Sequence, residues 1–245
     1  MATSTAKRRE QRLQSLLLDR LSFKYQRLIA KEIARTMVQT NLSNPLSIEE
    51  AEFAHKERID KLLNRLWFES ADQMIQQTFG QKQKALLASF QPTVGTNSIM
   101  RDFVRSFGLQ KIVQISSTTI KQLRDVINQS IADGLSERET SKLIQERAPT
   151  IAASRAQTIA RTETHVAANY AVQESFASTG IEAKREWVSA TDERTREAHQ
   201  DANGQIVGMN EPFIVGGEEL MYAGDPSGSA ENVINCRCAV VFVFD

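Results

Sequence analysis

The sequence predicts an α+β protein, with an extended helical N-terminal part followed by a small C-terminal domain of short strands, loops and a packed Ala-rich helix. Two observations predict this class. Apolar residues recur every three or four positions through the first 180 residues, as they do on one face of a helix. Seven of the 11 glycines lie from Gly180 onward, among short apolar runs and turn residues. We therefore expect a helical region at 1–149 and a second domain at 150–245.

The helical region is divided by clusters of residues that break helices. Proline stands in three such clusters, at 41–45, 91–95 and 148–149. The first predicted helix covers about residues 5–40. Its apolar face is formed by Leu13, Leu16, Leu17, Leu21, Leu28, Ile29 and Ile33.

Two capping boxes mark further helix starts. In this motif a serine caps the helix, and a glutamate three residues later bonds back to the serine backbone. Ser47 opens a second helix, whose apolar positions continue to Phe79. A third helix is expected within 98–133, and Ser136 then opens a short helix that ends near Arg147.

The C-terminal domain is expected to begin with the Ala-rich helix, which starts at Thr150 and ends at Gly180, a typical position for a C-cap glycine. The chain then changes to short apolar runs separated by turn sequences such as Asn203-Gly204. These runs predict four strands, at 184–189, 205–207, 213–215 and 238–244.

Composition excludes several classes of protein. The chain has 245 residues, of which 41% are hydrophobic and 24% charged, so a collagen-like or wholly disordered chain is not expected. No apolar run approaches the roughly 18 residues that a membrane span needs, so we expect no membrane partner. The basic N-terminus lacks the apolar core of a signal peptide. Two cysteines do not make a disulfide scaffold.

The net charge of zero conceals an asymmetry along the chain. Residues 1–100 carry 15 Lys and Arg against 10 Asp and Glu, whereas residues 186–245 carry 3 against 11. A basic front and an acidic tail favour different partners for the two ends. The alternative is that helices simply carry more Lys and Arg than loop-rich segments.

A Cys-x-Cys pair at the start of the last apolar run indicates a metal site. Cys236 and Cys238 would point to the same face of a strand, and His199 offers a third donor. Asp192, Asp201 or water would complete a tetrahedral set of the kind that zinc accepts. The alternative is that the cysteines are small hydrophobic residues of the core.

Other polar residues have structural interpretations beside functional ones. Thr191 and Asp192 form a good helix start, and Trp187 is expected in the core. Arg194 and Arg196 either pair with the acidic surface of the domain or reach inward to hold loop backbone or a carboxylate.

On the Ala-rich helix, Arg161, Glu163 and Asn169 either make buried polar contacts to the C-terminal domain or lie on a solvated face. His165 is expected to be packed or on the surface rather than a ligand. The chain shows no Ser/His/Asp triad, no carboxylate pair and no Gly-rich phosphate loop. The residues therefore predict no catalytic site.

Taken together in order and spacing, residues 160–238 resemble the phage head morphogenesis family, the Mu F-like minor head proteins. One departure is Ala223, where a proline is expected before the glycine. The resemblance is carried by Arg161-Thr162-Glu163, Trp187, Asp192-x-Arg194-Thr195-Arg196-x-x-His199, Phe213, Gly224-Asp225-Pro226 and Asn235-Cys236-Arg237-Cys238.

The resemblance implies a minor capsid protein of a tailed phage or prophage. Such a protein associates with the portal vertex and with other head proteins or scaffold, and affects DNA packaging or ejection. It is made in the host cytoplasm and ends in the virion head. Residues 1–149 would contact portal or capsid, and 150–245 would form the Mu F-like domain. The motif residues other than the candidate metal ligands would have structural roles, and the family brings no established catalytic mechanism.

Two other functions remain open from the residues. The first 40 residues carry nine Lys and Arg against three Asp and Glu, which suits a DNA-binding packaging accessory. A metal-dependent hydrolase or nuclease built on Asp192, His199, Cys236 and Cys238 would need an open coordination position for water. No obvious general base accompanies that cluster.

Overall fold

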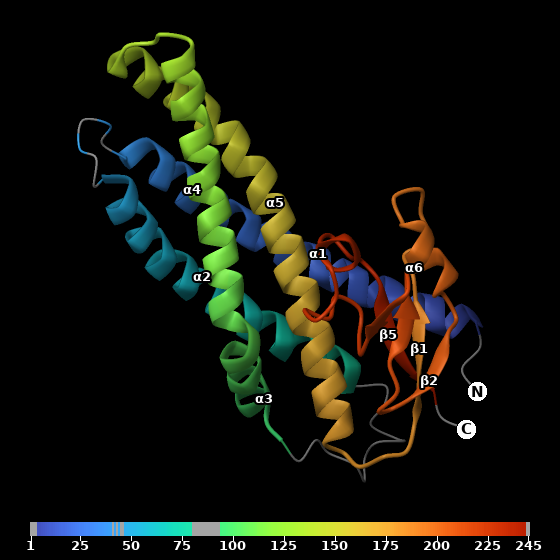
Figure 1. Ribbon diagram of the computed structural model, residues 1–245. Helices are drawn as coiled ribbons and strands as arrows, with labels where there is room; N and C mark the ends of the chain where they lie inside the picture. The colour runs from blue at the N-terminus through green and yellow to red at the C-terminus, as the bar shows by residue number, and fades with distance from the viewer. Residues whose placement is uncertain (1–3, 41, 43, 45–46, 80–93, 244–245) are drawn as a thin grey trace. The chain divides into compact units, whose positions relative to one another are not determined.

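A computed structural model describes residues 4–40, 42, 44, 47–79 and 94–243, and it confirms the α+β class (Figure 1). Its contacts divide the chain into two compact units. The first unit comprises Met1–Leu21, Leu66–Phe103 and Arg161–Asp245, and the second comprises Ser22–Arg65 and Val104–Ala160. The sequence-based division at residue 149 remains a prediction.

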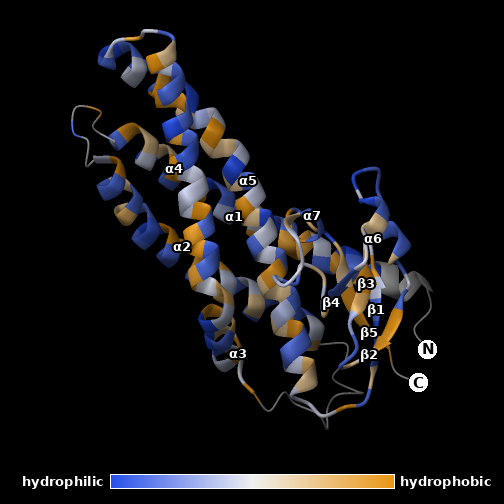
Figure 2. Ribbon diagram, viewed as in Figure 1, coloured by the Kyte–Doolittle hydropathy of each residue, from blue (hydrophilic) through white to orange (hydrophobic). Residues whose placement is uncertain are grey.

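Five α-helices and one short π-helix precede the first strand in the described residues. Figure 2 shows hydrophobic and hydrophilic residues mixed along each long helix, as expected for helices that bury one face. None of the helices that the structure describes is long and apolar enough to span a bilayer. The bounds are α1 (Ser4–Gln39), α2 (Ser47–Phe79), α3 (Thr96–Phe103), η1 (Val104–Gly108), α4 (Leu109–Ala132) and α5 (Glu137–Ala177).

Most of the predicted helix boundaries are confirmed. α2 begins at Ser47, and the second capping box is formed: the Glu139 carboxylate accepts bonds from the backbone N–H and hydroxyl of Ser136, at 2.8 and 2.6 Å. The third predicted helix is interrupted by the π-turn η1, which no proline marks. The breaker clusters at 41–45 and 91–95 fall largely outside the described residues.

The expected break at Pro149 is wrong, because α5 continues through it. Proline inside a helix costs about 3 kcal/mol, since it removes one backbone hydrogen bond and crowds the preceding turn. Ile144, Ala148, Ala152 and Ala156 form a fully buried stripe at four-residue spacing on both sides of Pro149. Burial of this continuous stripe outweighs the local cost.

The second unit contains a buried polar cluster between α1 and α2. The hydroxyl of Thr36 lies 3.0 Å from Nδ1 of His55, and Nε of Arg58 donates to the Glu32 carboxylate at 2.6 Å. Burial raises the pKa of Glu32, but hydrogen bonds from His55 and Arg58 outweigh this effect and lower the pKa overall. The cluster satisfies charges that the helix faces would otherwise bury unpaired.

The C-terminal residues form two small antiparallel sheets. β1 (Lys184–Val188) is the centre of a three-stranded sheet, between β2 (Ile206–Gly208) and β5 (Ala239–Val243). β3 (Phe213–Val215) pairs with β4 (Glu218–Leu220). The predicted strands are confirmed to within about two residues, although Phe244 lies outside the described residues.

Three features of this region differ from expectation. The strand β4 and the short helix α7 (Ala230–Val233) were not predicted. The helix start at Thr191-Asp192 is wrong, because α6 (Glu197–Asp201) begins later. The Asp192 carboxylate instead accepts bonds from the backbone N–H of Arg194 and the hydroxyl of Thr195, both at 3.1 Å. Such a side-chain turn competes with helix formation.

Aromatic residues fill the core of the first unit. Trp187 is fully buried, as predicted, and packs edge-on against Phe213 with ring centroids 5.4 Å apart. Phe176 on α5 stacks on Phe242 of β5 at 3.9 Å. A second group of buried residues joins α1, α2 and α5, and comprises Leu18, Met74, Ala168 and Val172.

Arg185 on β1 is a fully buried arginine that joins four segments of the first unit. Its guanidinium donates to the carbonyl oxygen of Gly208 from two nitrogens, at 2.9 and 3.1 Å, and to the carbonyls of Glu211 and Met221. It also donates to Oε1 of Gln173 on α5 at 3.2 Å. One side chain therefore satisfies carbonyls from β2 and two loops.

We expect Arg185→Met to destabilise the folded chain by about 3 kcal/mol, because the carbonyls of Gly208, Glu211 and Met221 each lose the donor that Arg185 supplies. Urea unfolding followed by circular dichroism would measure the change. Lys184→Met is the matched control on the adjacent, exposed position, and it should change stability by less than about 0.5 kcal/mol. Equal stability of Arg185→Met and the wild type would contradict the structural role given to the guanidinium.

Candidate metal centre

The structure brings His199, Cys236 and Cys238 together. Nδ1 of His199 lies 3.3 Å from Sγ of Cys238 and 3.7 Å from Sγ of Cys236. The three donor atoms all lie within 4.8 Å of one another, and each residue is only 2% exposed. α6 supplies the histidine, while the cysteines stand just before β5. Two segments more than 35 residues apart in sequence thus form one site.

The donor set fits a tetrahedral zinc ion. With Zn–S of about 2.3 Å and Zn–N of about 2.0 Å, a tetrahedral angle places nitrogen and sulfur about 3.5 Å apart. The two observed nitrogen–sulfur distances lie on either side of this value. The three residues also line a cavity of about 10 Å³, which has room for about one ion or water.

The two thiols titrate very differently. Hydrogen bonding to Cys238, and then to His199, lowers the pKa of Cys236 to about 5 despite its burial. The same thiol pair, together with burial, raises the pKa of Cys238. Their mutual hydrogen bond thus favours ionisation of Cys236 and disfavours ionisation of Cys238. A metal that binds both sulfurs must displace the second proton, so metal affinity should increase with pH.

Two residues in the loops around the centre have a positive φ angle. Asn235, which immediately precedes Cys236, has a φ of 57°, and Thr191 in the loop after β1 has a φ of 52°. Asparagine adopts this left-handed region readily, but the β-branched threonine pays an energetic cost there. Strained backbone of this kind concentrates at functional sites.

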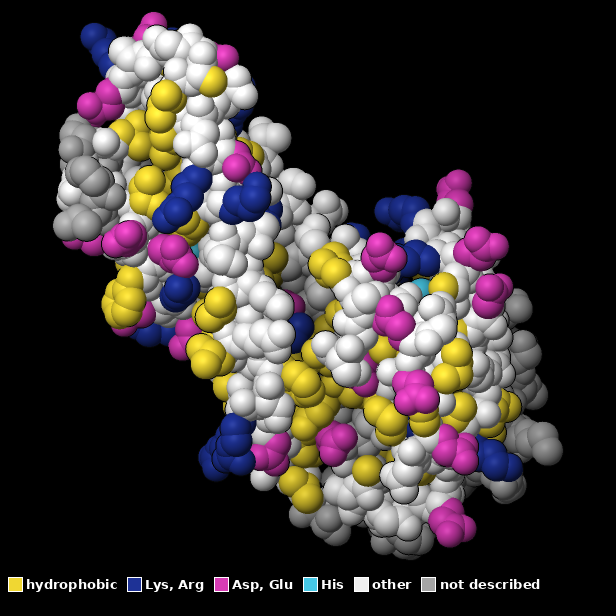
Figure 3. All heavy atoms as spheres, in the orientation of Figure 1, with side chains coloured by type: hydrophobic (Ala, Val, Ile, Leu, Met, Phe, Trp, Pro, Cys, Tyr) yellow, Lys and Arg dark blue, Asp and Glu magenta, His cyan; other side chains and the backbone are white. Residues whose placement is uncertain are grey.

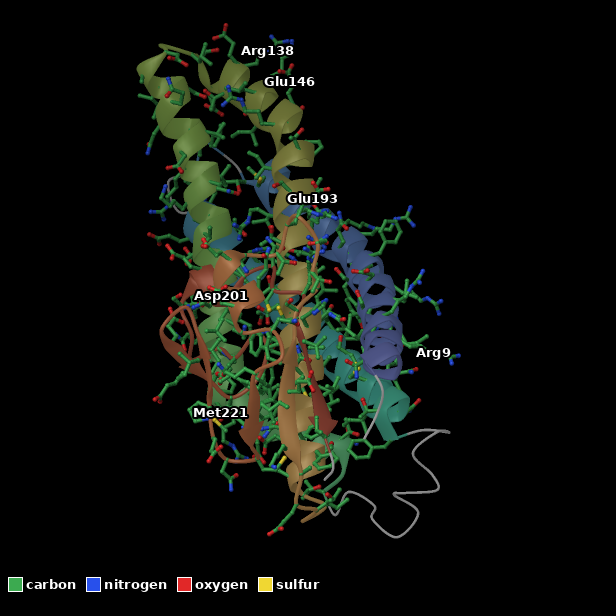
Figure 4. All side chains as sticks on the ribbon, turned by 90° about the vertical axis from the view of Figure 1, so that its right-hand side faces the viewer. Arg9, Arg138, Glu146, Glu193, Asp201 and Met221 are labelled. Atoms are coloured by element: carbon green, nitrogen blue, oxygen red, sulfur yellow. The ribbon has the colours of Figure 1, made fainter. Side chains whose placement is uncertain are left out.

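Asp192 has another partner. Both of its carboxylate oxygens accept bonds from the guanidinium of Arg237, the residue between the two cysteines. These bonds to Arg237 lower the pKa of the Asp192 carboxyl well below its usual range. Asp192 is not in the group with His199, and its role as a fourth ligand remains a prediction. Asp201 is exposed on α6 and lies outside the group as well (Figure 4).

The two motif arginines differ in their contacts. Arg196 donates to the backbone carbonyl of Ile234, so it holds the loop that leads to the cysteines. Arg194 is exposed, and the structure gives its guanidinium no hydrogen-bond or ion-pair partner among the described residues. Both arginines line the same small cavity as the three donors.

Three polar residues of α5 make buried contacts rather than facing solvent. Asn169 donates to the carbonyl of Ala223 at 2.8 Å, and Thr162 accepts the backbone N–H of Asn235 at 3.0 Å. Glu163 instead accepts the indole N–H of Trp67 on α2 at 2.9 Å. α5 therefore fixes the loop that carries the cysteines.

Two further residues of α5 lie near the same segment. His165 is 3% exposed and outside the metal group; burial, with Arg161 and Arg237 nearby, lowers its pKa to about 3. A neutral imidazole is thus expected at any ordinary pH. Arg161 is half-buried, and its Nε is buried without a hydrogen-bond partner.

Asp225 organises the turn that follows β4. Its carboxylate accepts the backbone N–H groups of Met221 and Ser227, at 2.8 and 2.9 Å, and the hydroxyl of Ser227 at 2.7 Å. The preceding Gly224 has a φ of 83°, and an added Cβ there would lie 3.3 Å from Val166 of α5. This turn thus needs glycine for both conformation and packing.

Sequence reasoning missed Arg185, Arg237 and Trp67. Strand periodicity could have found two of them. Arg185 lies two residues before the buried Trp187 and so faces the same side, whereas Arg237 alternates with the cysteines and so points away from them. Nothing in the sequence indicated that Trp67 would bond to Glu163.

The charge asymmetry of the sequence is visible on the surface. Figure 3 shows acidic side chains spread over the face that carries α6 and the small sheets. This agrees with the 11 acidic residues found among positions 186–245.

Comparisons with known proteins place the same segment in a recognised group. The sequence model described as Phage Mu protein F like protein matches residues 121–241. Bacillus subtilis (strain 168) YqbB is 25% identical over 184 residues, 72% of this chain and 60% of YqbB. Minor head protein GP7 of Bacillus phage SPP1 is 33% identical over 132 residues, 51% of this chain and 42% of GP7.

A third relative is an enzyme by name. NAD(+)--arginine ADP-ribosyltransferase EFV of Enterococcus faecalis (strain ATCC 700802 / V583) is 33% identical over 92 residues, 36% of this chain and 18% of that protein. The chain thus spans less than two thirds of the length of each of these relatives. No solved structure matches it.

We expect Asp192→Asn to destabilise the chain by up to about 1 kcal/mol at pH 7, because the ion pair with Arg237 is partly exposed. The folded-state pKa of Asp192 is lowered, so its contribution is complete above the unfolded value of about 3.9 and is lost as pH falls below it. Urea unfolding at pH 7 and pH 3 should show a smaller difference at pH 3. Equal differences would contradict an ionic origin, since asparagine can keep the turn.

Proposed function

Because residues 121–241 belong to the family of Phage Mu protein F like proteins, we propose that this chain is a minor head protein of a tailed phage or prophage. The observation that carries the proposal is the combined match to this family and to a minor head protein over 132 residues. The proposed location is the virion head, reached by assembly in the host cytoplasm.

The proposed partners are the portal protein and other head proteins or scaffold, contacted by the helical residues 1–149. Large exposed apolar side chains in each unit support this. Leu13 and Leu16 on α1 are 42% and 57% exposed in the first unit. Phe23 and Phe53 are 63% and 67% exposed in the second. Exposed apolar residues on helices suit helix-in-groove contacts with another protein, through which the chain would affect packaging or ejection.

The head role predicts that the chain copurifies with heads made from the genome that encodes it. Heads separated on a density gradient would be analysed by quantitative mass spectrometry. We expect the chain in every head-containing fraction, in far fewer copies than the major capsid protein. Its absence from purified heads, despite abundance in the lysate, would contradict the proposal.

The portal contact is tested by co-sedimentation of the full chain with purified portal rings. Phe23→Ser with Phe53→Ser should reduce the bound fraction at least about tenfold, since buried aromatic anchors commonly contribute 2 kcal/mol or more. Ile214→Ser is the matched control, because Ile214 is 49% exposed but lies on β3.

Zinc belongs to this proposal as a structural clip. His199, Cys236 and Cys238 would hold the ion, which would link α6 to the residues before β5. The close fit of the donor distances and the burial of all three residues support it. A metal that binds only the folded chain adds its binding free energy to stability.

Metal analysis of protein purified without chelator or His-tag should find about one zinc per chain. Cys236→Ser and His199→Ala should each lose the metal and lower Tm by several degrees. His165→Ala is the histidine control and should keep the metal, since His165 lies outside the donor group. If the wild-type protein contains no metal, the zinc proposal is wrong and the cysteines are small hydrophobic residues of the core.

DNA contact is a second candidate, favoured by one face of α1. Lys24, Arg27, Lys31 and Arg35 are all exposed at three- and four-residue spacing. The only acidic residue between them, Glu32, is buried and paired with Arg58. A row of cations of this kind can follow a phosphate backbone.

Four phosphate contacts predict that log K falls with log salt at a slope of about −3.6. Replacing Arg27 and Lys31 with glutamine should reduce the slope by about two, as measured by fluorescence anisotropy on duplex DNA. Lys121 and Lys142 are the control pair, because both are exposed lysines that bridge to acidic neighbours. Affinity that is indifferent to salt would exclude phosphate binding.

Neither a metal-dependent hydrolase or nuclease activity nor an ADP-ribosyltransferase activity gains support. Apart from His199 and the cysteines, the cavity is lined by Ala190, Arg194, Thr195, Arg196, Asn235 and Arg237, none of which is a carboxylate or second imidazole that could act as general base. The match to the ADP-ribosyltransferase covers 18% of that protein, so its named activity is not proposed for this chain.

A further inference from the structure

We propose that the centre formed by His199, Cys236 and Cys238 is open on one side and takes its fourth ligand from outside the chain, as a carboxylate oxygen that exchanges with water. This inference rests on the metal site proposed above. It adds the class of the missing ligand and the residue that attracts it.

The described residues offer no fourth donor of the usual kind. Among the described residues, no further histidine, cysteine, aspartate or glutamate joins the three that lie within 4.8 Å of one another. Thr195 and Asn235 supply the other side-chain oxygens that line the cavity. The Thr195 hydroxyl is already bonded to Asp192 at 3.1 Å. A four-coordinate ion would therefore bind something external, because zinc sites with three protein ligands complete their coordination with water or substrate.

The charges around the cavity favour an anion. Two thiolates neutralise a divalent ion, so the loaded centre carries no net charge. Arg237 is neutralised by the Asp192 carboxylate, but Arg194 is exposed and has no such partner among the described residues. Arg196 adds a second positive charge to the same lining. An incoming oxygen ligand thus meets excess positive charge, and a carboxylate pairs strongly with a guanidinium.

The position of Asn235 suits the water that would hold the fourth position when no carboxylate is bound. Its Oδ1 atom is buried and has no hydrogen-bond partner among the residues that the structure describes, and Asn235 lines the cavity. Buried polar atoms without a partner call for an explanation, such as a ligand or a water. A metal-bound water would donate to this oxygen.

The test uses the full chain loaded with Co²⁺, whose visible absorption reports both sulfur ligation and coordination number. Acetate would be titrated first, and then a capped peptide with one glutamate, to separate free carboxylates from side chains. We expect saturable shifts of the d–d bands with acetate. A shift with the peptide as well would assign side-chain carboxylates of a partner as a source, and a shift with acetate alone would assign small free carboxylates.

Arg194→Gln should weaken acetate binding about tenfold without changing the Co²⁺ stoichiometry or the sulfur-to-metal charge-transfer band. Arg138→Gln is the matched control, because Arg138 is exposed on α5 in the second unit (Figure 4). Failure to bind Co²⁺ would remove the metal site itself. A bound Co²⁺ whose spectrum ignores both carboxylates, or equal acetate affinity in Arg194→Gln, would overturn the open position while leaving the metal clip in place.

Discussion

The guanidinium of Arg185 ties several segments of the first unit to one another. β1 contributes the arginine, and its partners lie on β2, on two loops and on α5. Burying an arginine lowers its pKa through desolvation. The charge of Arg185 is retained because each guanidinium nitrogen donates to a carbonyl or amide oxygen. This one polar cluster fixes the loops between the short strands of this region.

The candidate metal centre depends on that fixed frame. β1 ends in the loop that contains Thr191 and Asp192, and Asp192 binds Arg237 between the cysteines. α5 holds the same cysteine loop from another side, through Thr162 and Asn235. Residues from three parts of the chain thus position the donors, which explains why the motif residues are spread over so long a segment.

The helical residues follow a different principle. They obtain stability from continuous buried stripes and from paired charges such as Glu32 with Arg58, and they leave other apolar and basic side chains exposed. A surface of this kind is available for partners, whereas the acidic C-terminal residues surround a core of buried aromatic and aliphatic side chains.

Periodicity and turn chemistry in the sequence determined the α+β class, the second capping box, four strands and the trio of His199 and two cysteines. These signals are local, or they follow from rare residue types. Only the tertiary structure decided that α5 passes through Pro149, that Asp192 binds Arg237, and that Arg185 and Trp67 find buried partners. Each of these outcomes depends on contacts between residues distant in sequence. The burial of these residues outweighs the local conformational preferences on which a prediction from sequence relies.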